Sequence, residues 1–181
     1  MNIAAIDIGS NGARLLIKSF DENAPASQRI RKLMFVRIPL RLGKDVFALG
    51  KISKERQHMM LHMMKGFSEF MQLYKVDHYR ACATSAMRDA DNGKKVMQRI
   101  EKHTGIRLEI IPGAAEAQLL CNNLVENTDS GVGNYAYVDV GGGSTEISLL
   151  HDGVLAESHS FNVVAGYSDF IAGDKVNFDK Q

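Results

Sequence analysis

The chain has 181 residues, 45% of them hydrophobic, and a formal net charge of +1. This length supports one domain, or one domain and part of a second, and the apolar content is ample for a core. The only cysteines, Cys82 and Cys121, sit in apolar contexts, which excludes a disulfide framework and indicates buried thiols of a reducing compartment. Asp7 and Arg14 interrupt the first apolar run, which excludes a signal peptide or a membrane span, so we expect a cytoplasmic protein with no membrane partner.

The net charge conceals an asymmetry between the two halves of the chain. Residues 1–90 contain 15 Lys and Arg against 8 Asp and Glu, whereas residues 91–181 contain 7 against 13. Between Arg29 and Arg56 there are nine basic residues and two acidic ones. Such a segment is either a solvated strand face or a surface that attracts polyanions. No aromatic residues alternate with these charges in a base-stacking pattern, so we do not expect nucleic acid as the partner.

Three strands are expected at the start of the chain, at residues 3–8, 14–20 and 30–39, joined as an antiparallel meander. The first of them is mostly apolar from Ala4 onward and is expected to be buried on both faces. The segment from Gly43 to Gly50 is predicted to be a loop. Ser53 then caps a long helix over about 54–75, and a strand at 78–83 follows.

The second half begins with a helix that opens at Asp91 or Asn92, runs to about His103 and stops at Gly105. The elements expected after it are a strand at 107–111, a helix at 114–125, a polar linker at 126–134, and strands at 135–140, 144–151 and 154–161. This order, in which strands restart after the linker, predicts a mixed-sheet α/β fold. We therefore expect a first lobe at 1–125 and the start of a second lobe at 126–181.

Two stretches of the chain share one pattern: a strand that ends near an aspartate, a glycine turn, and a second strand. They are Ile6-Asp-Ile-Gly-Ser-Asn-Gly and Val138-Asp-Val-Gly-Gly-Gly-Ser. Successive N–H groups in such turns can form an anion-binding concavity. Phosphate is therefore expected at Ser10, Asn11 and Gly12 in the first turn, and at Gly141, Gly142, Gly143 and Ser144 in the second. Asp7 and Asp139 would repel phosphate directly and are predicted to hold Mg²⁺, which bridges to phosphate oxygens.

A further polar segment follows the strand predicted at 78–83. Thr84 and Ser85 offer hydroxyl and N–H groups at a strand end, the usual ligand side of an α/β sheet. Arg88 is predicted to bind phosphate in bidentate fashion. The alternative for this arginine is an ion pair with Asp89 or Asp91 at the start of a helix.

Two glutamates complete the candidate site. Glu116 falls in the first turn of a predicted helix, where it is either a general base that deprotonates a water or simply a favourable partner of the helix dipole. Glu146 lies two residues past Ser144 and is expected either on the metal side of its strand or facing solvent.

At this point the chain resembles the Ppx/GppA family, the exopolyphosphatases and guanosine pentaphosphate phosphohydrolases of the actin/sugar kinase/Hsp70 superfamily. The resemblance lies in four motifs in family order, namely Asp7-Ile-Gly-Ser-Asn, Ala83-Thr-Ser-Ala-Met-Arg-Asp-Ala, Gly113-Ala-Ala-Glu-Ala and Asp139-Val-Gly-Gly-Gly-Ser-Thr-Glu. It implies an α/β fold of the ribonuclease H-like (actin-like ATPase) type, with a mixed sheet, flanking helices and an incomplete second lobe. It also implies that Glu116 is the catalytic base, that Asp139 and Glu146 position metal and water, and that Gly141, Ser144 and Arg88 contact phosphate.

The chain departs from the family pattern at two motif positions. Gly12 stands where the family usually has serine, and Ala115 stands where it has the first glutamate of a pair. Only 42 residues follow Asp139, fewer than the roughly 100–150 that a full second lobe needs. The alternatives are a fragment of a longer protein, a truncated gene product, or a homodimer that covers the sheet face left open.

The leading functional prediction is a Mg²⁺-dependent hydrolase that releases orthophosphate from polyphosphate or guanosine pentaphosphate. A kinase of the same superfamily is an alternative because both glycine hairpins would fit ATP. A third reading is a non-catalytic module that binds polyphosphate or guanosine penta- or tetraphosphate. Phosphate release measured beside binding separates these alternatives.

Overall fold

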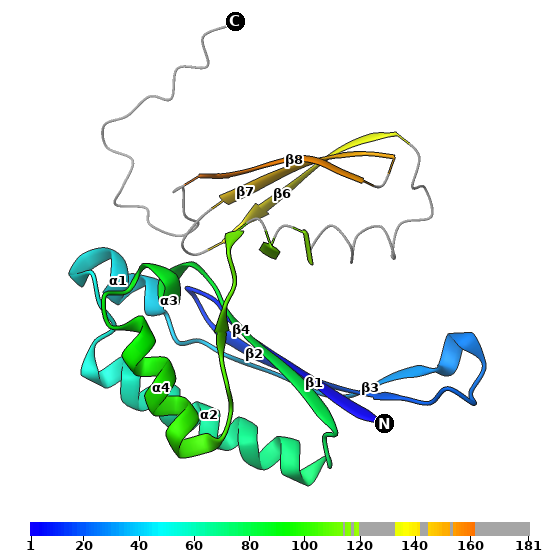
Figure 1. Ribbon diagram of the computed structural model, residues 1–181, viewed down its shortest axis with the longest axis horizontal. Coiled ribbons are helices and arrows are strands. Elements are labelled where there is room, and N and C mark those ends of the chain that lie inside the picture. Colours follow the sequence, from blue (N-terminus) through cyan, green and yellow to red (C-terminus); the bar gives the residue numbers. More distant parts are fainter. Residues whose placement is uncertain (114, 117, 120–132, 142–144, 153, 162–181) are drawn as a thin grey trace, which may run out of the picture.

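The computed structural model describes residues 1–113, 115–116, 118–119, 133–141, 145–152 and 154–161. Within these residues the strands form two separate sheets, and the second sheet lies on the side of the first that the main helices leave uncovered (Figure 1). Most of the residues predicted to bind phosphate and metal lie where the two sheets approach each other. The predicted boundary between lobes at 125 and 126 falls outside the described residues.

The first sheet has the strand order β3-β2-β1-β4-β5. Its strands are β1 (Asn2–Ile8), β2 (Ala13–Phe20), β3 (Ile30–Ile38), β4 (His78–Ala83) and β5 (Glu109–Ile110). The first three pair antiparallel, which confirms the predicted meander, whereas β4 runs parallel to β1 and β5 parallel to β4. The last strand is shorter than the 107–111 predicted.

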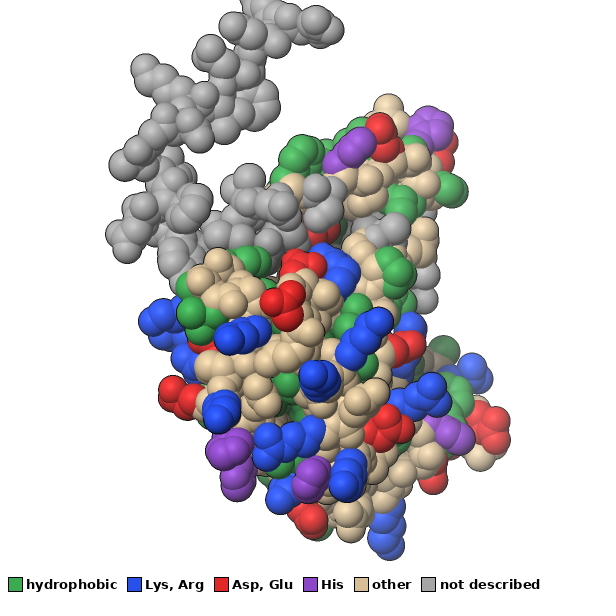
Figure 2. Space-filling model, turned by 60° about the vertical axis from the view of Figure 1, so that its left-hand side comes forward, with side chains coloured by type: hydrophobic (Ala, Val, Ile, Leu, Met, Phe, Trp, Pro, Cys, Tyr) green, Lys and Arg blue, Asp and Glu red, His purple; other side chains and the backbone are tan. Residues whose placement is uncertain are grey.

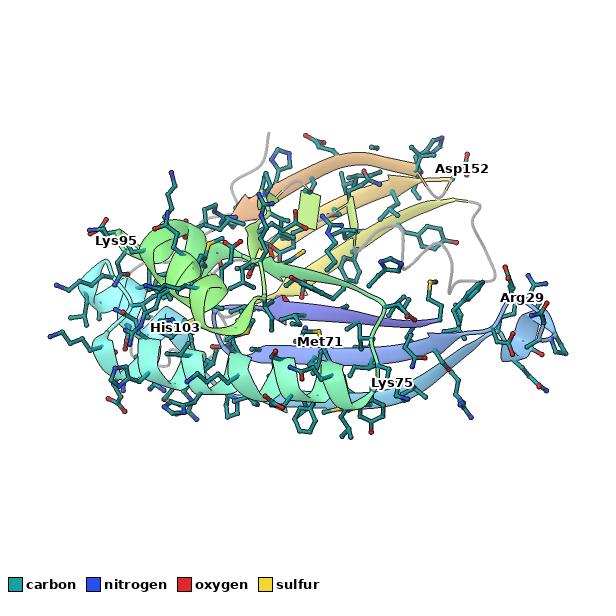
Figure 3. The ribbon with its side chains drawn as sticks, turned by 60° about the horizontal axis from the view of Figure 1, so that its bottom comes forward. Arg29, Met71, Lys75, Lys95, His103 and Asp152 are labelled. Carbon is teal, nitrogen blue, oxygen red and sulfur yellow. The ribbon has the colours of Figure 1, made fainter. Side chains whose placement is uncertain are left out.

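Helices cover one face of this sheet. They are α1 (Leu42–Leu49), α2 (Lys54–Leu73), α3 (Ser85–Asp89) and α4 (Gly93–Thr104), with a short 3₁₀ turn, η1 (Ala26–Gln28), between β2 and β3. Figure 3 shows α2 lying along the strands, with Met71 on the side of the sheet. The core joins Ile6, Leu15 and Ile17 of the sheet to helical side chains such as Phe67. We name the opposite side of this sheet its outward face.

The expectation that β1 is buried on both faces is wrong. Ala4, Ile6 and Ile8 are buried, but Ala5 between them is exposed and Asp7 is half-buried. Side chains alternate between the two faces of a strand, and in the described part of the chain α2 and α4 pack on only one of them. Apolar content alone did not distinguish a strand covered on one face from a central strand covered on both.

The sequence predicted the capped ends of the long helices, but it did not predict the two short helices. Ser53 caps α2 by accepting the N–H of Arg56 at 3.3 Å, and Gly105 ends α4 in the left-handed conformation. The loop predicted from Gly43 to Gly50 is instead α1. Its two glycines lie at the ends of the helix, where Gly50 is the left-handed cap and donates to the carbonyl of Val46. The turn of helix α3 was not predicted at all.

The second sheet is an antiparallel meander of β6 (Asn134–Val140), β7 (Thr145–His151) and β8 (Val154–Phe161), as predicted. In its register Asp139 lies opposite Glu146. Glu146, Ser148 and Leu150 are buried on one face, whereas Val138 and Val140 are exposed. Of the helix predicted at 114–125, the described residues 115, 116, 118 and 119 are helical and the remainder lies outside the description.

The charge asymmetry of the sequence corresponds to a difference in surface charge between the parts of the molecule built on the two sheets. In the view of Figure 2 the Lys and Arg side chains are spread over the lobe built on the first sheet, and the upper part, built on the second sheet, shows Asp, Glu and His. This agrees with the absence of Lys and Arg between Leu108 and Asp174. Among the described residues, no helix has both the length and the apolar character needed to cross a membrane.

Candidate active site

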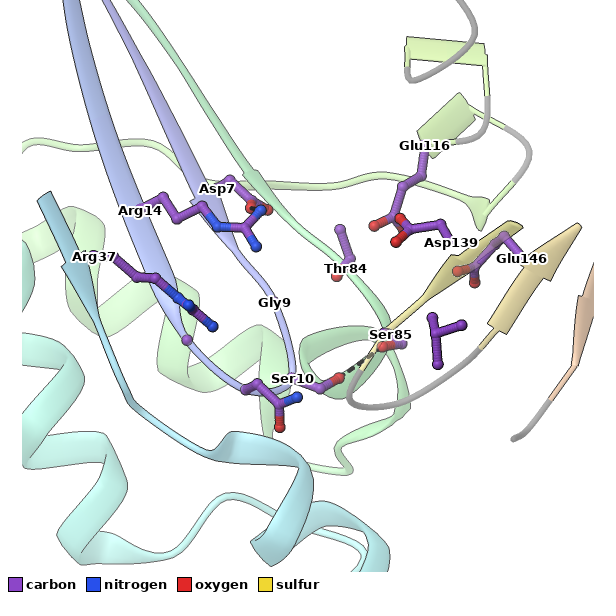
Figure 4. Close-up of a pocket in the computed structure, with 14 residues that line it drawn as sticks. Asp7, Gly9, Ser10, Arg14, Arg37, Thr84, Ser85, Glu116, Asp139 and Glu146 are labelled. Carbon is purple, nitrogen blue, oxygen red and sulfur yellow. Dashed lines mark hydrogen bonds and ion pairs between the residues drawn. The ribbon is translucent and has the colours of Figure 1, made fainter. Parts of the chain in front are cut away.

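A pocket of about 210 Å³ lies between the two sheets (Figure 4). The first sheet contributes the end of β1 and the turn after it, and the second contributes the end of β6 and the start of β7. Residues from β2, β3, the β4–α3 junction and the helical segment at Glu116 complete the walls. The pocket therefore gathers side chains from segments that are more than 100 positions apart in the chain.

The first glycine turn forms the floor on one side of the pocket. The N–H of Gly9 donates to the carbonyl of Gly12 at 2.9 Å, and Ser10, Asn11 and Gly12 all line the cavity. Ser10 is buried, and its hydroxyl hydrogen-bonds that of Ser85 at 2.8 Å. Thr84 and Ser85 line the cavity as well, so the structure brings these predicted phosphate ligands together.

A loop after β3 holds this turn from outside. The backbone N–H groups of Arg41 and Gly43 donate to the carbonyls of Asn11 and Ser10, each at 2.9 Å. Arg41 adopts a left-handed conformation, with φ of 54°, at the start of α1. A Cβ atom at Gly12 would lie 2.9 Å from the carbonyl oxygen of Ile38, so glycine permits this close approach.

Four carboxylates face the pocket from four different segments. They are Asp7, Glu116, Asp139 and Glu146. Glu146 is buried rather than turned to solvent, which decides between the two orientations expected for it. Figure 4 shows Glu116 and Asp139 extending toward each other.

The electrostatics of the site follow from this crowding. Burial, with the negative charges of Glu146 and Asp7 adding to it, raises the pKa of Glu116 to about 7, and Arg88 partly opposes the shift. Burial also raises the pKa of Asp7, although Arg14 opposes it by charge and by a hydrogen bond. Carboxylates whose pKa values are raised within one pocket are typical of catalytic sites.

The donor set suits Mg²⁺ in an open arrangement. Carboxylate oxygens are the protein ligands that Mg²⁺ prefers, and it usually takes one or two of them and completes its shell with water and substrate phosphate. Within the described residues no three acidic, histidine or cysteine side chains already converge as a ligand group. The pocket therefore fits a metal held jointly by a few carboxylates and a phosphate, and does not form a closed protein cage.

Comparison with known proteins now adds to this geometry. A sequence profile of the Ppx/GppA phosphatase family matches residues 25–168. The chain belongs to the Ppx/GppA phosphatase family. The matched segment begins after the first glycine turn, so the assignment does not depend on that turn.

Individual Ppx/GppA relatives agree with the assignment. Exopolyphosphatase 2 of Mycobacterium tuberculosis is 32% identical over 159 residues, which are 85% of this chain and 50% of that protein. Exopolyphosphatase 1 of Mycobacterium leprae is 28% identical over 148 residues, which are 82% of this chain and 42% of that protein. The chain thus spans about half the length of the curated relatives it matches.

Solved Ppx/GppA structures confirm the fold. An exopolyphosphatase from Cytophaga hutchinsonii superposes with a TM-score of 0.82 at 28% identity, over 91% of this chain and 51% of that one. The Ppx/GppA member from Aquifex aeolicus gives 0.76 at 25% identity, over 91% of this chain and 52% of that one. The predicted α/β fold, a mixed sheet of the ribonuclease H-like (actin-like ATPase) type with flanking helices, is confirmed.

One member of the predicted Ppx/GppA site, Arg88, is placed differently from expectation, and three others are not described. Arg88 is not among the residues that line the pocket, and its Nε donates to Asp89 at 3.2 Å, which is the alternative left open from the sequence. Its phosphate contact stays a prediction. In the second glycine turn Gly141 lines the pocket, whereas Gly142, Gly143 and Ser144 lie outside the described residues.

Two arginines in the pocket wall, Arg14 of β2 and Arg37 of β3, were not predicted from the sequence. They are cross-strand partners, and Arg14 also lies opposite Asp7 of β1, to which its Nη1 donates at 3.1 Å. The pairing register of the predicted hairpin between the first two strands could have indicated Arg14. The first turn pairs Ile8 with Ala13, which places position 14 beside Asp7 on the same face.

Cys82 is half-buried rather than buried, which corrects the expectation from its apolar neighbours. It lies opposite Asp7 on the outward face, and its thiol donates to Glu109 at 3.4 Å. Partial burial, with this hydrogen bond adding to it, raises the pKa of the thiol to about 11. The raised pKa keeps the thiol protonated at neutral pH, a state that does not favour nucleophilic chemistry. The second cysteine, Cys121, lies outside the described residues.

Proposed function

We propose that this chain carries the catalytic pocket of a Mg²⁺-dependent phosphoanhydride hydrolase, which releases orthophosphate from the end of inorganic polyphosphate or from guanosine pentaphosphate. The observation that carries the proposal is the pocket itself. It combines an anion-binding glycine turn, two arginines and four carboxylates between two sheets. The names of the Ppx/GppA relatives support the phosphatase class.

Glu116 is the proposed general base. Its carboxylate extends into the pocket beside Asp139, and burial brings its pKa to about 7. A base is most effective when its pKa lies near the working pH, because it is then both available and able to take the proton. Glu116 would orient a water and accept its proton while the water oxygen attacks the terminal phosphorus. The bridging P–O bond to the next phosphate would break, which releases orthophosphate and leaves the shortened chain with the bridging oxygen.

The opposite wall is proposed to hold the phosphoryl group. The N–H of Gly9 is already used by the carbonyl of Gly12, and the turn residues after it offer their N–H groups as fixed dipoles. The buried pair of Ser10 and Ser85 offers hydroxyls. Arg14 and Arg37 supply positive charge in the same pocket as the turn. Asp7, Asp139 and Glu146 are the candidates for holding Mg²⁺, one or two of them directly and the rest through water. The metal when bound would neutralise charge on the phosphate oxygens.

The test of the function pairs two measurements on the same protein. Phosphate release is followed with polyphosphate and with guanosine pentaphosphate, and calorimetric titration with the same compounds and with guanosine tetraphosphate measures binding. Turnover of either substrate together with binding supports the hydrolase. Binding without any release would leave the non-catalytic module, which is the second candidate because the chain spans about half of its relatives. Transfer of phosphate from ATP to an acceptor would instead indicate a kinase.

Mg²⁺ is expected to stabilise the fold by relieving repulsion among the pocket carboxylates. At ten times its dissociation constant a ligand of the native state contributes about 1.4 kcal/mol, which raises Tm by about 4 °C in a chain of this size. Thermal denaturation with and without Mg²⁺ measures the shift. The double variant Asp7→Asn, Asp139→Asn should lose the shift, and Glu101→Gln on the exposed surface of α4 should keep it. A shift of equal size in the double variant would show that the metal binds elsewhere.

A further inference from the structure

Four cationic residues form a strip on the outward face of β2 and β3. They stand in two cross-strand pairs, Arg14 with Arg37 and Lys18 with Lys32. We name this set the outward strip. Between the two pairs lie Leu16 and Phe35, which face each other in the same register. Arg37 and Lys32 are exposed, Lys18 is half-buried, and 54% of Phe35 is exposed, so the strip is open to solvent.

A β-bulge places the second pair on this face. The register runs from Ile17 opposite Met34 directly to Lys18 opposite Lys32, so Leu33 is the extra residue. In a regular ladder Lys18 would lie opposite Leu33, and alternation would turn Lys32 toward the helices. Bulges re-aim side chains in this way. The irregularity exchanges a leucine for a lysine on the outward face.

The strip carries an unbalanced charge. Cations directly opposite each other on neighbouring strands destabilise a sheet, and here this happens twice on one face. Asp7 pairs with Arg14, whereas no ion pair is found within the described part of the chain for Lys18, Lys32 or Arg37. Such an arrangement is compensated when a polyanion binds.

The strip is continuous with the pocket. Arg14 and Arg37 line the pocket itself, and Lys18 lies four residues further along β2, about 13 Å away at a rise of about 3.3 Å per residue. A ligand that reaches both pairs must therefore carry charge over that distance beyond the site of reaction.

We propose that the outward strip is a second binding segment for the tail of a linear polyphosphate whose end occupies the pocket. The inference rests on the proposed function and names the longer of its two substrate classes. A guanosine nucleotide has too few phosphates in line to span both pairs. Single-stranded nucleic acid is disfavoured because repeated aromatic platforms bind its bases. Between the two pairs of the strip, Phe35 is the one aromatic side chain.

The double variant Lys18→Gln, Lys32→Gln tests the strip and leaves every pocket-lining residue in place. Its affinity for long-chain polyphosphate should fall about tenfold, and the slope of log affinity against log salt should flatten by about one to two, because two phosphate contacts are lost. Affinity for tripolyphosphate, which is too short to reach the second pair, should stay unchanged. The matched control Lys94→Gln, Lys95→Gln removes the same charge from exposed positions of α4 and should affect neither ligand.

The outcomes separate the strip from the proposed reaction. Equal loss for both chain lengths, or no loss for the long chain, overturns the strip, as does a wild-type protein that binds both lengths equally. If single-stranded RNA of equal charge binds as tightly and loses as much, the strip is a nucleic-acid surface and the proposal is wrong. Binding with the expected losses but without phosphate release would contradict the hydrolase alone.

Discussion

Glu116→Gln is expected to lower the rate of phosphate release by about 10²–10⁴-fold, the range that a general base contributes. Glutamine keeps the shape of the side chain but cannot accept a proton from water. Binding of polyphosphate should be retained or improved, because the substitution removes one negative charge from a pocket that already holds Asp7, Asp139 and Glu146. Single-turnover phosphate release and calorimetric titration of the same variant measure the two effects separately.

The matched control is Glu101→Gln, the same chemical change at an exposed position of α4. It should leave both rate and affinity unchanged. Normal turnover by Glu116→Gln would refute the assignment of the base. A parallel loss of binding and turnover would instead show that Glu116 holds the substrate. The thermal stability of the variant should not fall, because a carboxylate whose pKa is raised to about 7 is destabilised by its surroundings when it is charged.

Gly12→Ser is expected to destabilise this protein by about 1–3 kcal/mol, the usual cost of overpacking. The reason is geometric. A Cβ atom at this position would lie 2.9 Å from the carbonyl oxygen of Ile38, and that oxygen belongs to backbone at the end of β3. Relief requires the turn or the strand to move. We therefore also expect phosphate release to fall, since Asn11 and Gly12 line the pocket.

Gly66→Ala provides the control for Gly12→Ser. Gly66 lies within α2, and a Cβ atom there meets nothing within 4 Å. The substitution should stabilise the protein by about 0.5–1 kcal/mol, because alanine favours a helix interior. Urea denaturation of both variants measures the free energy of unfolding. Unchanged stability and activity in Gly12→Ser would show that the loop after β3 adapts freely and that the turn tolerates displacement.

The sequence predicted elements well where a local signal determines the structure. The meander of the first three strands follows from apolar runs and the turn residues between them. The start of α2 follows from Ser53 and the end of α4 from Gly105. Helix α1 was missed because the glycines near its two ends were taken as the signal of a loop. The spacing of the buried Leu42 and Val46 is what distinguishes a helix from a loop here. Helix α3, with five residues, is too short to show a periodic pattern.

The candidate site shows a similar division. Asp7, Ser85, Glu116 and Glu146 were found from motifs, because each motif places polar groups at a strand end or helix start, and the structure brings all four to one pocket. The arginines of β2 and β3 belong to no motif. Their place depends on strand register, and the bulge beside Lys32 depends on a contact between strands that no single segment encodes.

The loop after β3 has a consequence for how the glycine turn meets a ligand. In a trans peptide the carbonyl and the following N–H point in opposite directions. Because Gly43 and Arg41 hold the carbonyls of Ser10 and Asn11, the amide hydrogens of Asn11 and Gly12 are directed away from that loop, and neither peptide plane can swing its oxygen toward an incoming anion. The ordering of these two peptides is thus settled during folding, so a phosphate that arrives spends none of its binding energy on arranging them.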